Sequence, residues 1–157
     1  MGGSVVTSLA GLRPDLVAGV ILTESNLDPG GGMWSCRITS MTEDEFVARG
    51  YQELIDEQKR QCPTWARTLS LSSPVALYRE ASSLIEGTVP TWREIVYGLE
   101  CPRFYIFGDK TLPDEDAEEL PRHGVQVRVV ERAGHNMVYD NPESFVQMLK
   151  DCLEQMP

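Results

Sequence analysis

The stretch Arg103-Phe104-Tyr105-Ile106-Phe107-Gly108 decides the fold: it is a short apolar and aromatic run that ends at a glycine. Its length and composition predict a buried strand. A helix is expected next, at Glu115–Arg122, and then a second apolar strand at Val125–Glu131. A strand, a helix and a strand in this order predict two parallel strands joined by a crossover helix.

The flanking segments extend this pattern in both directions. Toward the N-terminus, a helix pattern at Val5–Leu12 precedes a third apolar run, Leu16–Thr23, which predicts another buried strand. Toward the C-terminus, Ala133–Asn136 predicts a tight turn, and Asn141-Pro142 opens a final helix with the proline at its first position. The expected fold class is therefore α/β, with about three parallel strands flanked by helices.

A long segment between the first two strands has helical patterns. Thr42 is a good N-cap because three acidic residues follow it. Helices are expected from Thr42 to about Gln61, over Cys62–Leu71, over Ser73–Glu86 and over Trp92–Leu99. The expected organisation is an α/β core made of residues 1–32 and 99–157, with a helical insertion at residues 33–98.

Composition narrows the function classes. The 157 residues include 24 acidic and 14 basic side chains, a formal net charge of −10, and 41% are hydrophobic. This length and hydrophobic content predict a globular chain with a real core. The acidity argues against nucleic-acid partners and anionic membrane surfaces, which need basic faces. No apolar stretch approaches the roughly 20 residues of a membrane span, and no signal-peptide pattern opens the chain.

The cysteines and histidines do not predict a metal site. Cys36, Cys62, Cys101 and Cys152 are widely spaced and form no Cys-x-x-Cys pair. We expect reduced thiols and a cytoplasmic location, because a chain of this length does not need disulfides. The two histidines do not fall into paired zinc-ligand spacing with these cysteines. Neither a metal nor a cofactor is therefore expected.

Four stretches, taken in order along the whole chain, carry a family resemblance. They are Met1-Gly2-Gly3-Ser4-Val5, Arg13–Leu22, Cys101–Gly108, and Ala133–Val138 followed by Asn141-Pro142-Glu143. Together they resemble the α/β-hydrolase family, from just after its nucleophile to its C-terminus. The resemblance implies a partial α/β-hydrolase fold, in which residues 33–98 stand where that family inserts its helical cap.

The resemblance also implies a catalytic triad of nucleophile, histidine and acid. His135 matches the family's histidine loop and is the expected base. The acid has three candidates. Glu24, at the end of the strand after the first helix, ranks first. Asp109 ranks second. The family's usual Gly-x-x-Asp pattern after the penultimate strand would place the acid at Thr111, and Asp109 lies two positions earlier. Asp28 ranks third.

The nucleophile is expected to be missing from this chain. In the family's Gly-x-Ser-x-Gly elbow, Met1 would be the residue that follows the serine, and its backbone nitrogen would be one oxyanion donor. Ser4 then falls in the first turn of a helix rather than on the elbow. The isolated chain is therefore expected to have little activity. An aspartate nucleophile, which family members use for other bonds, stays open.

Two functions follow as alternatives. The first is the C-terminal portion of a serine-type hydrolase that cleaves an ester-like bond in a small-molecule substrate. The second is a genuine shortened homologue without catalysis, acting as a binding or oligomerising module. Three strands leave an open apolar sheet edge, so the second alternative expects a homo-oligomer or a partner chain that covers this edge.

Overall fold

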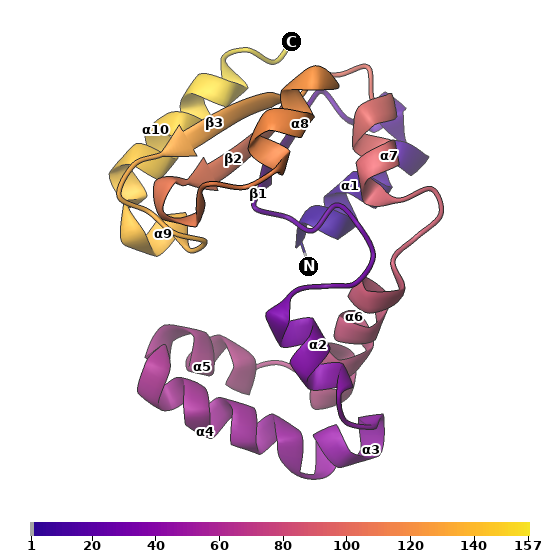
Figure 1. The fold of residues 1–157 in the computed structure, drawn as a ribbon, viewed down its shortest axis with the longest axis vertical. Helices are drawn as coiled ribbons and strands as arrows, with labels where there is room; N and C mark the ends of the chain where they lie inside the picture. Colours follow the sequence, from indigo (N-terminus) through magenta and orange to yellow (C-terminus); the bar gives the residue numbers. More distant parts are fainter. Residues whose placement is uncertain (1) are drawn as a thin grey trace. The chain divides into compact units, whose positions relative to one another are not determined.

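The computed structural model describes residues 2–157. The described chain forms two compact units, which are labelled by their helices and strands in Figure 1. The core unit comprises the residues up to Leu27 together with Val89–Pro157, and the helical unit comprises Asp28–Thr88. None of the helices in residues 2–157 is long and apolar enough to cross a membrane.

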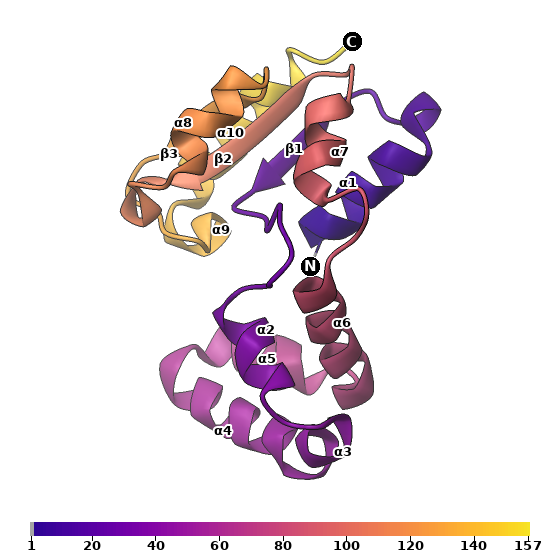
Figure 2. The ribbon, with the colours of Figure 1, turned by 45° about the vertical axis from the view of Figure 1, so that its right-hand side comes forward.

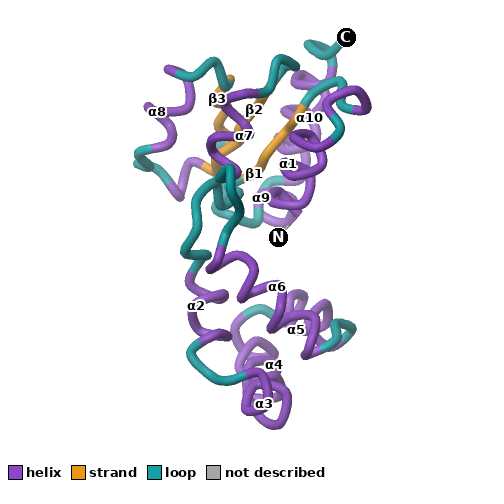
Figure 3. Tube along the Cα trace, turned by 90° about the vertical axis from the view of Figure 1, so that its right-hand side faces the viewer, coloured by secondary structure: helices purple, strands orange, loops and turns teal. Residues whose placement is uncertain are grey.

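The core unit contains a three-stranded sheet in the order β1-β2-β3. The strands are β1 (Val20–Thr23), β2 (Arg103–Gly108) and β3 (Gln126–Val130), and both neighbouring pairs are parallel. In this register Tyr105 lies between Leu22 and Val127. The strands lie side by side in Figure 3. The expected α/β class with three parallel strands is confirmed.

One face of the sheet packs on helices α1 (Gly2–Leu12), α7 (Trp92–Gly98) and α8 (Asp116–Arg122). Tyr105 and Phe107 of β2 point into this layer, and each of the three helices contributes a buried side chain to the same core cluster. Burying one such large side chain contributes about 1.5–3 kcal/mol. The central strand is therefore firmly anchored on this side.

The alternate side chains of β2, Phe104 and Ile106, point to the opposite face. There they pack with helices α9 (Met137–Asp140) and α10 (Pro142–Leu153). Both side chains are at most 1% exposed. Figures 2 and 3 show α8 and α10 on opposite sides of the strands. Helices on both faces explain why the residues of β2 are almost all apolar.

The helical unit has its own core. It contains α2 (Met33–Thr39), α3 (Glu43–Glu45), a π-helical turn (Phe46–Gly50), α4 (Tyr51–Gln61), α5 (Pro63–Ser70) and α6 (Pro74–Glu86). Six buried side chains form its centre: Ile38, Phe46, Leu54, Ile55, Leu69 and Ala81. The sequence prediction of helices in this part of the chain is confirmed, whereas the separate helix α2 was missed.

Local capping signals set the helix starts as the sequence predicted. Thr42 accepts a hydrogen bond from the backbone of Glu45, whose carboxylate binds the Thr42 backbone in return. Asn141 caps α10 by accepting from the Ser144 backbone, and Pro142 takes the first helical position. These bonds span only three residues, which is why sequence patterns reveal them.

Two expected boundaries differ from the structure. The strand expected at Leu16–Thr23 begins only at Val20, because Pro14–Leu16 forms a 3₁₀ turn and strand pairing starts where the Val20 N–H donates to the Pro102 oxygen, at 2.9 Å. Helix α7 falls inside the expected insertion of residues 33–98, yet it belongs to the core unit. There Trp92 Nε1 donates to Ser8 Oγ of α1, at 3.2 Å.

Candidate active site

The carboxyl ends of the three strands bring the candidate residues together. Glu24 follows β1 directly, Gly108 is the last residue of β2, and His135 lies in the turn after β3. Because the strands are parallel, these three ends lie along the same edge of the sheet. The Glu24 N–H donates to the Ile106 oxygen at 3.2 Å, which continues the pairing of β1 with β2 up to this residue.

The side chains of Glu24 and His135 form a hydrogen-bonded pair. Glu24 Oε2 lies 3.0 Å from His135 Nδ1. An ionised carboxylate can only accept, so Nδ1 carries the proton and donates it. A neutral His135 then keeps its lone pair on Nε2. The Glu24 side chain is 10% exposed and that of His135 is 68% exposed, so the acid is sheltered while the ring stays open on its other side.

The second oxygen of the Glu24 carboxylate is also bound. Oε1 accepts from the backbone N–H of Gly108 at 2.8 Å and from the hydroxyl of Thr111. Thr111 lies in the 3₁₀ turn Asp109–Thr111 that continues from β2. The carboxylate is therefore held by two donors on one oxygen and by the imidazole on the other.

The backbone is unusual in the two turns that carry the pair. Across residues 2–157, the non-glycine residues with positive φ are Glu24 (φ 41°) and Arg132 (φ 57°). Non-glycine residues rarely adopt this region, and each instance costs of the order of 1–3 kcal/mol. Residues held this way concentrate at functional sites, because the surrounding structure must enforce the strain. Glu24 is a member of the Glu24–His135 pair, and Arg132 lies three residues before His135 in the chain.

Asp109, the second-ranked acid, has a different environment. Its Oδ1 accepts from the Ala133 N–H at 3.0 Å, and the backbone of Arg132 also hydrogen-bonds to this carboxylate. The Arg132 bond is the main reason that the Asp109 pKa lies below its usual value. Lys110 N–H also donates to the Ala133 oxygen, at 3.0 Å. Asp109 thus braces the turn before His135, and its hydrogen bonds do not include the imidazole.

A close backbone approach holds the same turn from the β2 side. A Cβ on Gly108 would lie 2.3 Å from the Ala133 oxygen, so only glycine fits there without movement. On the other flank, Gly134 N–H donates to Asp140 Oδ2 at 2.7 Å. The loop that carries His135 is therefore fastened on both sides.

The remaining sequence candidates are Asp28, Ser4 and Met1. Asp28 is exposed and belongs to the helical unit, whereas the pair of Glu24 and His135 is complete within the core unit. Ser4 is buried in the first turns of α1, as expected for a helix residue. Met1, the expected oxyanion donor, lies outside the described residues.

His123, the other histidine, ends α8 and has a structural environment. Its ring stacks on Tyr97, with 3.8 Å between the ring centroids, and its Nε2 lies 3.0 Å from Glu119 Oε1. The stacking joins α8 to α7, and the Glu119 contact lies within α8. Within the part of the chain that the structure describes, no three or more histidine, cysteine or acidic side chains gather as a metal site requires.

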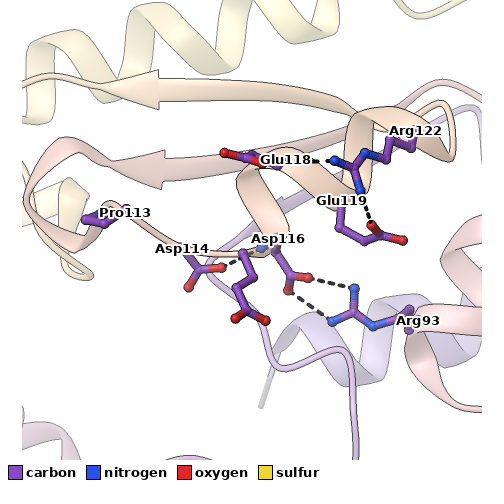
Figure 4. Close-up of a pocket in the computed structure, with 8 residues that line it drawn as sticks. Arg93, Pro113, Asp114, Asp116, Glu118, Glu119 and Arg122 are labelled. Carbon is purple, nitrogen blue, oxygen red and sulfur yellow. Dashed lines mark hydrogen bonds and ion pairs between the residues drawn. The ribbon is translucent and has the colours of Figure 1, made fainter.

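A separate cavity of about 660 Å³ lies beside the start of α8 (Figure 4). Its lining is mostly acidic, and Arg93 reaches into it from α7 to form a half-buried ion pair with Asp116, at 2.7 Å. Asp114 Oδ1 accepts from the N–H of Asp116, the first residue of α8. Neither Glu24 nor His135 lines this cavity. These acidic side chains lie at the solvated start of α8, where negative charge interacts favourably with the helix dipole.

Sequence reasoning missed the role of Thr111. A signal was present, because Thr111 occupies the position where the Gly-x-x-Asp pattern places the acid. The structure shows that the hydroxyl there donates to an acid that comes from another strand.

Comparison with known proteins gives the same fold. No protein-family model matches the chain. It is 22% identical to the esterase Rv0045c of Mycobacterium tuberculosis over 183 aligned residues, which cover 98% of this chain and 58% of that protein. The chain thus spans less than two thirds of this relative.

Several solved structures have a similar fold. An esterase from Thermogutta terrifontis superposes with a TM-score of 0.70 at 24% identity, covering 98% of this chain and 62% of that one. NosK from Streptomyces actuosus superposes with a TM-score of 0.59 at 28% identity, covering 98% and 65%. An α/β hydrolase from a deep-sea metagenome, MGS-M2, has a TM-score of 0.66 at 14% identity, covering 99% and 63%.

Proposed function

Because the chain has part of the α/β-hydrolase fold, we propose that its protein hydrolyses an ester-like bond in a small molecule. The mechanism uses a nucleophile, His135 and Glu24. The observation that carries the proposal is the 3.0 Å contact between Glu24 Oε2 and His135 Nδ1. The esterases among the similar proteins support the choice of bond.

The two residues have separate roles in this proposal. Glu24 holds the His135 proton on Nδ1 and stabilises the imidazolium that forms during the reaction. His135 Nε2 takes the proton of a serine hydroxyl as the serine oxygen attacks the carbonyl carbon. It then passes this proton to the departing alkoxide. A water molecule, deprotonated in turn by His135, then attacks the carbonyl of the acyl-serine. This second step releases the carboxylic acid product and restores the serine.

The nucleophile in this proposal lies on a segment that precedes α1. Among residues 2–157, no serine, threonine or cysteine side chain hydrogen-bonds to His135. A nucleophile elbow is a strand followed by a sharp turn and a helix, and α1 provides such a helix. We therefore expect the isolated chain of 157 residues to hydrolyse esters no faster than its His135→Gln variant.

The first experiment reads the DNA directly upstream of the Met1 codon. An open frame that encodes a strand ending in Gly-x-Ser supports the serine mechanism. A strand ending in Gly-x-Asp would replace it with a carboxylate nucleophile. The extended protein is then assayed with p-nitrophenyl acetate and labelled with a fluorophosphonate. A stoichiometric label on Ser4 would contradict the proposal, because Ser4 is buried within α1.

The helical unit is assigned a substrate-shaping role as part of the same proposal. It has an independent core, and Trp34 and Trp65 lie in it with ring centroids 4.7 Å apart. Large aromatic side chains of this kind suit an apolar acyl or alcohol group. Trp34→Ala is expected to change the preference between p-nitrophenyl acetate and butyrate. An unchanged preference would remove this role.

A second candidate function rests on the outer edge of β1. This strand pairs only with β2 in the described sheet. A groove of about 340 Å³ runs beside it, lined by apolar residues that include Val6, Leu9 and Leu16. The chain could act without catalysis as a module that pairs this edge with a second copy of itself or with a partner chain. Light scattering discriminates, because a stable monomer with a bare edge counts against this candidate.

A further inference from the structure

The end of β2 and the turn that follows it bind both the Glu24 carboxylate and the loop that carries His135. On one side, the Gly108 N–H and the Thr111 hydroxyl bind Glu24 Oε1. On the other side, the Lys110 N–H binds the Ala133 oxygen in the turn before His135. A short stretch of backbone thus sets the position of the acid relative to the histidine loop.

The Thr111 hydroxyl has one proton and two acceptors within reach. It lies 2.8 Å from the Gly108 oxygen and also contacts Glu24 Oε1. The ionised carboxylate is the stronger acceptor, because a charged partner strengthens a hydrogen bond. The proton is therefore directed to Glu24 Oε1, and the Gly108 oxygen is the competing acceptor.

A glutamate side chain needs such a restraint. It has three rotatable bonds, and a single backbone donor to Oε1 would leave the carboxylate free to turn about that bond. A second donor on the same oxygen fixes the carboxylate plane and leaves Oε2 aimed at His135 Nδ1, 3.0 Å away. Thr111 itself is exposed, so its hydroxyl does not serve the packing of the core.

We propose that Thr111 is a positioning residue for the candidate acid: its hydroxyl holds the Glu24 carboxylate so that His135 keeps its proton on Nδ1. This inference rests on the proposed function, because the fixed tautomer leaves His135 Nε2 ready to accept a proton. It concerns the geometry of the pair, so it can be measured without turnover.

The test compares Thr111→Val, which removes the hydroxyl, with Thr111→Ser, which keeps it. Nitrogen-15 NMR of the complete labelled protein distinguishes the two neutral tautomers of His135. The spectrum of His135→Gln identifies the His135 signals by their loss. Glu24→Ala gives the reference for a ring without its acid, and the melting temperature of each variant shows that it is folded.

We expect the Nδ1–H tautomer in the unsubstituted protein and in Thr111→Ser. Thr111→Val is expected to shift the tautomer ratio toward that of Glu24→Ala. If the protein hydrolyses esters, Thr111→Val should lower kcat about tenfold, with KM changed less than about twofold, because the hydroxyl acts through Glu24 and not on the substrate. Thr111→Ser should restore most of kcat.

Each contrary outcome identifies what fails. A Thr111→Val protein with the original tautomer ratio and kcat overturns the positioning role. A shifted tautomer in a protein that hydrolyses no ester supports the positioning role and counts against the proposed function. If Glu24→Ala leaves the tautomer ratio of His135 unchanged, both the positioning role of Thr111 and the proposed role of Glu24 are overturned.

Discussion

Glu24 Oε2 lies 3.0 Å from His135 Nδ1 although 111 residues separate the two in the chain. The parallel pairing of β1, β2 and β3 brings their ends together. The acid is nearly buried and has partners on both oxygens, whereas the imidazole is open to solvent on its far side. This asymmetry suits an acid that orients a base.

Replacing Glu24 tests the role of the acid. Glu24→Gln puts an amide beside Nδ1 and can favour the wrong imidazole tautomer. We expect kcat of the complete protein to fall about 10³- to 10⁴-fold with KM nearly unchanged, measured with p-nitrophenyl acetate. Glu100→Gln, at an exposed position, is the matched control. An active Glu24→Gln together with an inactive Asp28→Asn would assign the acid to Asp28 instead.

Replacing His135 tests the base. His135→Gln should lower kcat by at least about a thousandfold, because no other group in the proposal accepts the proton of the nucleophile. The imidazole is 68% exposed, so the free energy of unfolding should change by no more than about 0.5 kcal/mol. His123→Gln is the control and should keep kcat. Equal loss in the two histidine variants would contradict the assignment.

The pH dependence of stability tests the brace formed by Asp109. Backbone hydrogen bonds, first that from Arg132, hold the Asp109 pKa below its usual value. A lowered folded-state pKa stabilises the protein above the unfolded value, and this stabilisation is lost as the pH falls through the folded-state value. Asp109→Asn should therefore lower the melting temperature at pH 7, and the difference should disappear toward about pH 2–3.

The control for this measurement is Glu131→Gln, an exposed carboxyl in the same turn. Its side chain makes no hydrogen bond or ion pair among the described residues. The melting temperature of this variant should differ little from that of the unsubstituted protein at either pH. A pH-independent effect of Asp109→Asn would show that the carboxylate charge does not hold the turn.

The exposed apolar face of α1 predicts self-association of the isolated chain. Leu9 and Leu12 are 48% and 79% exposed on α1, and Leu9 lines the groove beside β1. The double variant Leu9→Glu/Leu12→Glu should lower the apparent mass at high protein concentration in light scattering, because charges oppose apolar association. Leu71→Glu, at a leucine 89% exposed in the helical unit, is the matched control. An equal decrease in apparent mass for the double variant and for Leu71→Glu would show that self-association does not depend on the face of α1.

Much of the fold was predictable because its signals are local. The run from Phe104 to Phe107 predicted the central strand, and Thr42 and Asn141 predicted helix starts through bonds that span three residues. The start of β1 was not predictable from hydrophobicity alone. Leu16 is as apolar as Val20, and only the position of the neighbouring strand decides where pairing begins.

The candidate site was predictable in part. His135 and Glu24 were identified by resemblance, and the structure brings them together. Asp109 was indistinguishable from an acid candidate in the sequence, because nothing local shows that its carboxylate faces the backbone of Arg132 and Ala133. Thr111 was visible only as a departure from a familiar pattern, since its partner lies 87 residues away.

The sequence by itself determined the α/β class, the succession of helices and strands, and the residue types able to carry proton transfer. These depend on apolar periodicity and on contacts within one helical turn. Only the tertiary structure decided which acid meets His135 and which side chain holds that acid. The register of the three strands and the two strained turns determine where each carboxylate points, and both result from packing between segments that are distant in the chain.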